Sequence, residues 1–160
     1  MILKNKIKGW GLLVTACIIS CDGTLGGFNT ISFPKSKKNI ENAIDTLYSN
    51  YPDYRIPDKY KDFDNWSKSG YDFLDTRIFY FSQAPEEMYY VSFVGDEEAF
   101  KDSTHIDIAI RAVFVGNKKK WFKQEDFSKE EESRIQARFN SEIISKLERY
   151  TKSKAKDLGY

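Results

Sequence analysis

One row of side chains in this sequence has residue types that could transfer protons. The chain's single histidine, His105, is followed by Asp107 and Arg111 within an alternating stretch. Alternate side chains of a strand share a face, so we expect the three to line up. A histidine beside a carboxylate can act as a general acid or base once a water-shielded site positions it. The sequence indicates no such site here, and a solvated sheet face with local ion pairs is the favoured interpretation.

Aspartates in the long stretch after residue 52 are the second candidate, for metal binding. They lack the D-x-D-x-D-G spacing of a calcium loop, and lysines interrupt them. The sequence also offers no Cys/His set for zinc, no glycine-rich phosphate loop and no G-x-S-x-G serine motif. We therefore expect no catalytic residue, no metal and no cofactor. The aspartates concerned are Asp58, Asp62, Asp64, Asp72 and Asp75.

The only two cysteines, Cys17 and Cys21, lie at the end of an apolar run that follows the basic stretch MILKNKIK. The run is too short to cross a membrane as a helix, which takes about 20 apolar residues. A basic start followed by roughly 7–15 apolar residues is typical of a secretory signal peptide. A redox or metal-binding cysteine pair is disfavoured, because no histidine lies nearby. An uncleaved signal anchor remains the alternative.

The four residues Ile18-Ile19-Ser20-Cys21 resemble the lipobox of bacterial lipoproteins, although Ile18 stands where Leu is commoner. The resemblance implies cleavage between Ser20 and Cys21, with a diacylglycerol on the thiol of Cys21. Residues 1–20 would then be a signal peptide, removed together with Cys17. The expected location is the bacterial cell envelope, lipid-anchored to an inner or outer membrane, with the domain exported. The resemblance covers residues 1–21 only.

Length and composition predict one folded domain after this leader. The chain has 160 residues, of which 41% are hydrophobic and 16% aromatic, enough for a core. Its formal charge is only +1, which argues against a nucleic-acid binder. Residues 21–35 are rich in Gly, Ser and Thr and predict a lipidated, flexible tether. The alternation of Phe28, Ile31 and Phe33 favours docking of its end as an edge strand.

Residues 36–160 predict a single α+β domain with the order helix, four strands, helix. Ser36 caps a first helix over 37–50, and Ser128 with Glu131 forms a capping box for a long helix over about 129–154, frayed after Tyr150. A connection over 52–75 includes a possible short helix near 59–68. We expect an antiparallel sheet of about four strands with both helices on one face, a two-layer sandwich. The expected strands are 76–83, 87–95, 104–115 and a short edge strand through Trp121 and Phe122.

Aromatic residues in the 52–75 connection are the candidate partner-binding residues: Tyr54, Tyr60, Trp66 and Tyr71. Tyrosine and tryptophan are favoured in protein interfaces, but they also fill the cores of small sheets. The first hypothesis is therefore a lipid-anchored accessory subunit of an envelope assembly such as a secretion apparatus, or an immunity protein. A small-ligand carrier is the alternative, and an enzyme acting on envelope polymers is less favoured.

Overall fold

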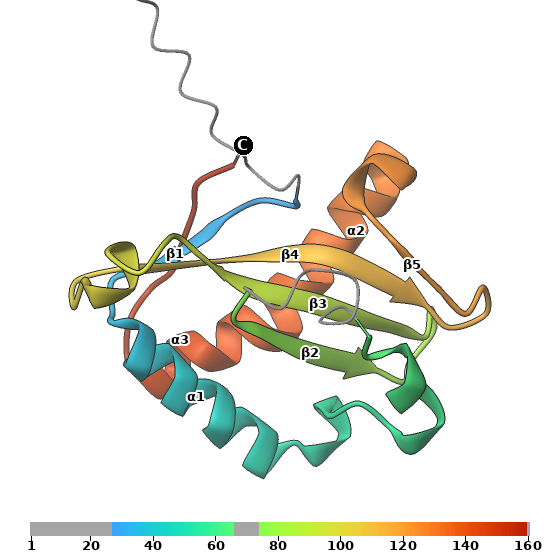
Figure 1. Ribbon diagram of the computed structural model, residues 1–160, viewed down its shortest axis with the longest axis horizontal. Helices are drawn as coiled ribbons and strands as arrows, with labels where there is room; N and C mark the ends of the chain where they lie inside the picture. The colour runs from blue at the N-terminus through green and yellow to red at the C-terminus, as the bar shows by residue number, and fades with distance from the viewer. Residues whose placement is uncertain (1–26, 66–73, 160) are drawn as a thin grey trace, which may run out of the picture.

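The computed structural model describes residues 27–65 and 74–159, and Figure 1 shows their arrangement. Ser20, Cys21, Trp66 and Tyr71, which carry several of the predictions above, lie outside these ranges. The described chain forms an α+β fold in which helices pack against an antiparallel sheet, as the sequence predicted. Its main elements in order are β1 (Ile31–Phe33), α1 (Lys37–Asn50), β2 (Thr76–Phe81), β3 (Glu87–Val94), β4 (Ile106–Val115), β5 (Lys120–Phe122), α2 (Lys129–Phe139), α3 (Ser145–Thr151) and β6 (Lys156–Asp157).

The sheet has six strands rather than the expected four. Its order is β2-β3-β4-β1-β6, and β5 also pairs with β4, all antiparallel. The additional strands β1 and β6 have only three and two residues. Strands this short are too brief for a two-residue period to be recognised, and their pairing depends on partners far away in the sequence. Both predicted hairpin partners, β2 and β3, are confirmed.

The helices cover one face of the sheet, where the main core lies. Figure 1 shows α2 and α3 passing behind the strands, with α1 along the lower side. Ser36 caps α1 by accepting a hydrogen bond from the Asn39 amide, and Ser128 forms the expected capping box with Glu131. Fully buried residues of the helices and strands meet in one cluster, which includes Phe33, Ile40, Leu47, Phe79, Tyr89, Ile108, Phe139 and Leu147.

The C-terminal helix differs from the uninterrupted 129–154 helix that the sequence predicted. A π-helical turn over Asn140–Ile144 separates α2 from α3, and α3 ends at Thr151. Lys152 takes a left-handed conformation with φ of 49°, which ends the helix, and the Ser153 amide donates to the Glu148 carbonyl. The residues beyond do not fray. They return to the sheet as β6.

The opposite face of the sheet is partly covered by the second half of the connection after α1, residues 58–63. A 3-10 helix over Pro52–Tyr54 is followed by a second over Asp58–Phe63, close to the short helix expected near 59–68. Tyr60 and Phe63 from this segment pack on Phe114 of β4, with ring centroids 5.0 and 4.8 Å apart. A second cluster forms there from Tyr60, Tyr80, Met88 and Phe114.

The described chain begins and ends side by side. Phe28, within the predicted tether, is 3% exposed, and its amide donates to the Ile110 carbonyl. The Leu158 amide donates to the Thr30 carbonyl at 2.9 Å, so β6 lies outside β1. The end of the tether therefore enters the sheet, as its alternation indicated, but between two strands rather than at the edge. Figure 1 shows the C-terminal segment, coloured red, running close to β1, coloured blue.

Candidate functional site

Two of the four predicted binding residues, Tyr54 and Tyr60, are described, and both make contacts within the fold. Tyr54 donates to Glu142 Oε2 at 2.5 Å and accepts from Lys146 Nζ at 3.0 Å, while its ring contacts Phe81. Tyr60 is 6% exposed and donates to Glu86 Oε2 at 2.9 Å. These contacts hold the 52–63 segment against the helices and the sheet. Burial and the carboxylate at its hydroxyl raise the pKa of Tyr54.

The predicted row of His105, Asp107 and Arg111 is interrupted in the structure by a β-bulge. His105 precedes β4, is 55% exposed and pairs through Nδ1 with Asp102 at 2.8 Å. The pairing register of β4 with β3 shifts between Tyr90 and Val91, so Arg111 is an extra, bulged residue. Its Nε donates to Ser92 Oγ at 2.7 Å. His105 thus makes a local, largely exposed contact with Asp102, before β4 begins.

A buried carboxylate on the helix side is the most enclosed charge of the described chain. Glu87, the first residue of β3, is 1% exposed. The two terminal nitrogens of Arg134 donate to Glu87 Oε2 at 3.0 Å and to Oε1 at 2.6 Å. Arg138 also donates to Oε2, at 3.2 Å. Tyr89 donates a further hydrogen bond at 3.0 Å. Because both arginines project from α2, this cluster fixes the helix to the β2–β3 hairpin. Arg138 also donates to the carbonyls of Gln83 and Pro85 in that hairpin.

The sequence analysis missed this cluster, although a signal for it exists. Glu87 alternates with Tyr89, Val91 and Phe93, all of which point into the core. A carboxylate in that register is buried, and a buried charge requires a cationic partner. Arg134 and Arg138 are four residues apart and so share one face of α2. That spacing marks them as the partners.

A second carboxylate cluster lies on the opposite side of the sheet, one residue earlier. Glu86 accepts from Lys59 Nζ at 2.5 Å, Tyr80 at 2.6 Å and Tyr60 at 2.9 Å. The lysine first, then the tyrosine hydroxyls, lower the pKa of Glu86 to about 2. This cluster fastens the Asp58–Phe63 helix to the tip of the hairpin. Gly116 lies against it, with its amide donating to the Glu86 carbonyl.

Three surface cavities have described linings. One of about 220 Å³ lies at the edge of β2 and includes Tyr48 and Arg55, and one of about 230 Å³ lies between α1 and α3. The largest, about 330 Å³, lies between the start of β1 and α2. Small-molecule sites usually have volumes of roughly 300–1,000 Å³, so only the third reaches that range. Its lining consists of Phe28, Asn29, Lys129, Glu132, Ser133, Gln136, Ala137 and Asn140.

Within residues 27–65 and 74–159, no three His, Cys, Asp or Glu side chains gather as metal ligands would. A separate finding is that every helix in these ranges is too short or too polar to span a bilayer. Comparisons with protein-family models, curated proteins and solved structures found no match to this chain. Its function is therefore argued from its own residues.

Proposed function

We propose that this chain is a bacterial lipoprotein whose folded domain binds another protein of the cell envelope. The observation that carries the proposal is the sequence Ile18-Ile19-Ser20-Cys21 at the end of a short apolar run. Acyl chains on Cys21 would give stable membrane anchoring, since each buried methylene contributes about 0.8 kcal/mol. The membrane, inner or outer, holds the domain close to its partner and raises their effective concentration.

The position of Phe28 supports anchoring close to the bilayer. Phe28 is already buried in the fold, so only the six residues 22–27 separate it from Cys21. A fully extended chain rises by roughly 3.3–3.6 Å per residue, which sets the greatest span from Cys21 to Phe28 at about 25 Å. The domain would therefore stay within one protein diameter of the lipid surface. Its partner must be a membrane protein or another envelope component at the same height.

The segment from Tyr51 to Phe63 is the proposed binding surface. Tyr54 and Tyr60 hold it in place through their carboxylate contacts, rather than offering free phenol groups. Tyr51 is 38% exposed, and exposed charged residues of both signs follow it along the segment. An exposed aromatic among charges is typical of an interface anchor with a polar rim. The exposed charged residues are Asp53, Arg55, Asp58, Lys59, Lys61 and Asp62.

Replacing Cys21 tests the lipid anchor. Cys21→Ala should abolish labelling by a fatty-acid analogue and release the protein from sedimented membranes, while Cys17→Ala should keep both. The two cysteines share the same apolar run, which makes Cys17→Ala the matched control. Labelling that survives Cys21→Ala, or that disappears with Cys17→Ala, would contradict the lipobox interpretation.

Site-specific photo-crosslinking in membranes tests the binding surface. A crosslinking residue at Tyr51 or Asp62 should yield a discrete adduct that mass spectrometry identifies as one envelope protein. The same residue at Glu97, which is also exposed but on another loop, should not. Equal adducts from all three positions, or none from Tyr51 and Asp62, would refute binding through this segment.

A small-ligand carrier is the second candidate function. The cavity of about 330 Å³ between β1 and α2 favours it. A carrier and a protein-binding subunit are both compatible with a lipid anchor, and the ligand site can be tested separately.

A further inference from the structure

The outer edge of β2 has a backbone acceptor already occupied and a backbone donor left over. Strand β2 is the last in the sheet order, and the Asp75 carbonyl before it accepts from the Phe93 amide of β3. Backbone groups alternate in direction along an antiparallel strand, so those of Ile78 point away from β3. The Ile78 carbonyl accepts from the Tyr48 hydroxyl at 2.7 Å. Among the described residues, no group accepts a hydrogen bond from the Ile78 amide.

Arg55 adds further hydrogen-bond donors at the same edge. Its guanidinium carbon lies 4.7 Å from the centroid of the Tyr48 ring, and that ring stacks on Phe79 at 5.5 Å. Stacking of this kind holds the guanidinium plane in place without using its N–H groups. Arg55 is exposed and forms no ion pair with a carboxylate of the described residues. Its donors are therefore available to a ligand.

Arg55 and Ile78 line one cavity, which has a volume of about 220 Å³. Small-molecule sites usually begin at roughly 300 Å³, so this cavity suits the end of one inserted side chain better than a separate molecule. Arg77 and Asp64 also border it. Arg77 already pairs with Asp75 at 2.6 Å, which leaves Arg55 as the cation of the lining without a fixed partner.

We propose that this cavity receives an acidic side chain from an extended segment of the partner protein, with Arg55 and the Ile78 amide as its donors. A carboxylate only accepts hydrogen bonds, and it matches the fork of an arginine. The inference rests on the proposed protein-binding function, because Arg55 lies within the Tyr51–Phe63 surface, and it adds the chemistry that the partner must present. Figure 1 shows β2 as the lowest strand, with α1 and the connection after it below.

Nuclear magnetic resonance titration of the ¹⁵N-labelled full chain in non-ionic detergent tests the proposal with synthetic peptides. The probe is acetyl-Val-Glu-Val-amide, and acetyl-Val-Gln-Val-amide is the matched control without a charge. The acidic peptide should shift the Ile78 backbone amide and Arg55 Nε signals in a saturable manner. It should bind about tenfold more tightly than the control, since a hydrogen bond to a charged group contributes roughly 1.5–3 kcal/mol. Equal affinity of the two peptides, or shifts that leave Ile78 unaffected, would overturn the proposal.

A third peptide separates a side-chain carboxylate from the end of a chain. Acetyl-Val-Gln-Val with a free C-terminus carries its one carboxylate on the backbone, and it should bind as weakly as the control. If it binds as tightly as the acidic peptide, the choice of a side chain as the ligand is wrong.

Variants of the lining make the test specific to the cavity. Arg55→Gln should weaken binding of the acidic peptide about tenfold, because it removes the charged donors. Lys61→Gln, on the same segment but outside the lining, removes a charge of the same sign and should leave affinity unchanged. Asp64→Asn removes the acidic member of the lining and should tighten binding. Equal losses from Arg55→Gln and Lys61→Gln would mean general charge attraction and would refute the site.

These outcomes are separate from those of the crosslinking experiment at Tyr51. A discrete adduct at Tyr51 without any binding of the acidic peptide would refute this site and leave the proposed protein-binding function standing. Specific binding of the peptide without an adduct at Tyr51 or Asp62 would support the site and refute the proposed envelope partner.

Discussion

Glu86 and Glu87 are neighbours in the chain, yet they serve opposite sides of the sheet. Alternation along the strand turns Glu87 toward the helices, where it is 1% exposed between Arg134 and Arg138. The side chain of Glu86 is 29% exposed and meets Lys59, whose own side chain is 57% exposed. Glu87 therefore lies in the interior beside two guanidinium groups, and Glu86 lies at the surface beside the ammonium group of Lys59.

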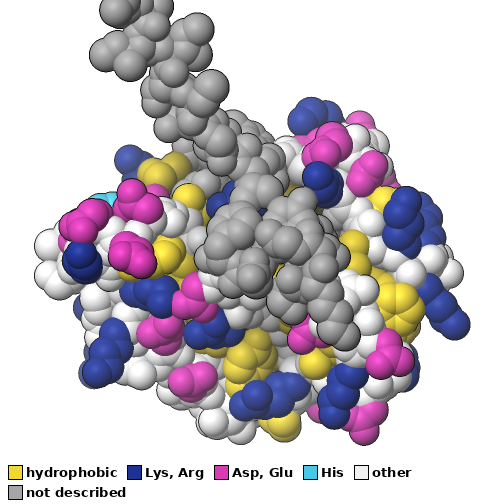
Figure 2. All heavy atoms as spheres, in the orientation of Figure 1, with side chains coloured by type: hydrophobic (Ala, Val, Ile, Leu, Met, Phe, Trp, Pro, Cys, Tyr) yellow, Lys and Arg dark blue, Asp and Glu magenta, His cyan; other side chains and the backbone are white. Residues whose placement is uncertain are grey.

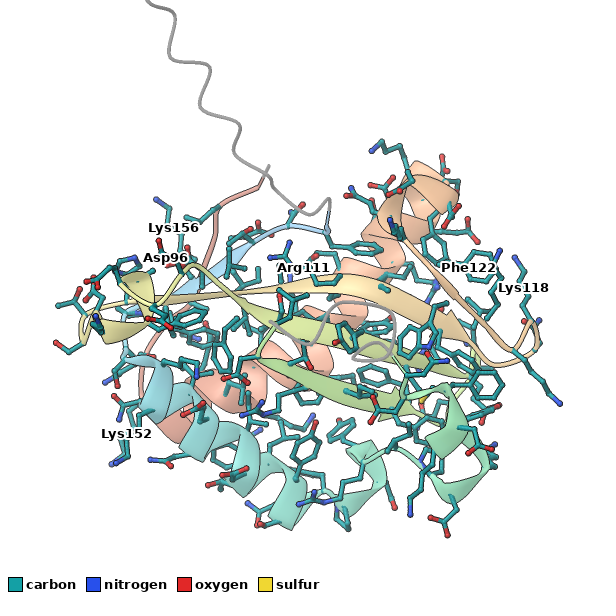
Figure 3. All side chains as sticks on the ribbon, viewed as in Figure 1. Asp96, Arg111, Lys118, Phe122, Lys152 and Lys156 are labelled. Atoms are coloured by element: carbon teal, nitrogen blue, oxygen red, sulfur yellow. The ribbon has the colours of Figure 1, made fainter. Side chains whose placement is uncertain are left out.

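The difference teaches how the two layers are attached. A buried charge whose partners are removed costs several kcal/mol, whereas an exposed ion pair contributes about 0–1 kcal/mol. The contact of Glu87 with Arg134 and Arg138 therefore fixes the helix layer, and breaking it would cost several kcal/mol of stability. The Asp58–Phe63 helix on the other face is held by tyrosine rings and a weaker ion pair. Figure 3 shows the side chains of the described residues on the ribbon, with Arg111 labelled on β4.

Removing the charge of Glu87 should have the largest effect. Glu87→Gln keeps the shape but leaves two arginines without their anion, and we expect unfolding to become easier by about 3 kcal/mol. Urea denaturation followed by circular dichroism measures it. Glu98→Gln, which alters the exposed Glu98–Lys101 pair, is the control and should change stability very little. A Glu87→Gln variant as stable as the wild type would show that the two carboxylates are equivalent.

Adding one methyl group beside Glu86 should have an intermediate effect. A Cβ at Gly116 would lie 2.9 Å from Glu86 Oε2 and 3.1 Å from the Tyr60 hydroxyl. Gly116→Ala should therefore destabilise the fold by about 1–3 kcal/mol and loosen the 52–63 segment first. Hydrogen exchange can locate the change. In a Glu86→Ala background the same substitution should cost less, and an equal cost would place the strain elsewhere.

Neutralising Glu86 should have the smallest effect, and it should depend on pH. In the folded protein the pKa of Glu86 is about 2, below its usual value of 4.5. As the pH falls, Glu86 is therefore protonated in the unfolded chain before it is protonated in the folded protein. The stability from this group is complete above pH 4.5 and is lost toward pH 2. Glu86→Gln should cost about 1 kcal/mol or less at pH 7, because the pair is partly exposed.

Thermal unfolding of wild type and Glu86→Gln between pH 7 and pH 2 checks this window. The difference between the two proteins should shrink below pH 4.5 and vanish near pH 2. A difference that stays constant over the whole range would mean that Lys59 and the tyrosines do not favour the ionised form.

Local patterns made much of this fold predictable from the sequence. Ser36 and Ser128 mark helix starts through hydrogen bonds within three residues, and those starts are confirmed. The β2–β3 hairpin was equally predictable, because two runs rich in aromatic and β-branched residues flank the short turn Ala84-Pro85-Glu86. Features of this kind need no knowledge of the rest of the chain.

Long-range contacts account for what the sequence did not reveal. β1 pairs with β6 across more than 120 residues, and Glu87 meets Arg138 across 51. The π-helical turn at Asn140 follows a stripe that looks uniformly helical, so periodicity does not locate it. The cavity near Gln136 also escaped prediction, since it combines a strand start with a helix that lies about a hundred residues later. Figure 2 shows charged side chains of both signs interspersed over the coloured part of the visible face.

The pairing of β1 with β6 has a mechanical consequence. The root of the tether and the C-terminal residues emerge at the same end of this antiparallel pair, with Thr30 bonded to Leu158 and Gly159. If Cys21 carries the proposed lipid, a pulling force between it and a load on the C-terminus would open these bonds one after another, from Thr30 toward Ser32. Strand β6 would peel away and lengthen the C-terminal end, while β1 stays paired with β4 and the helices and the central strands remain folded.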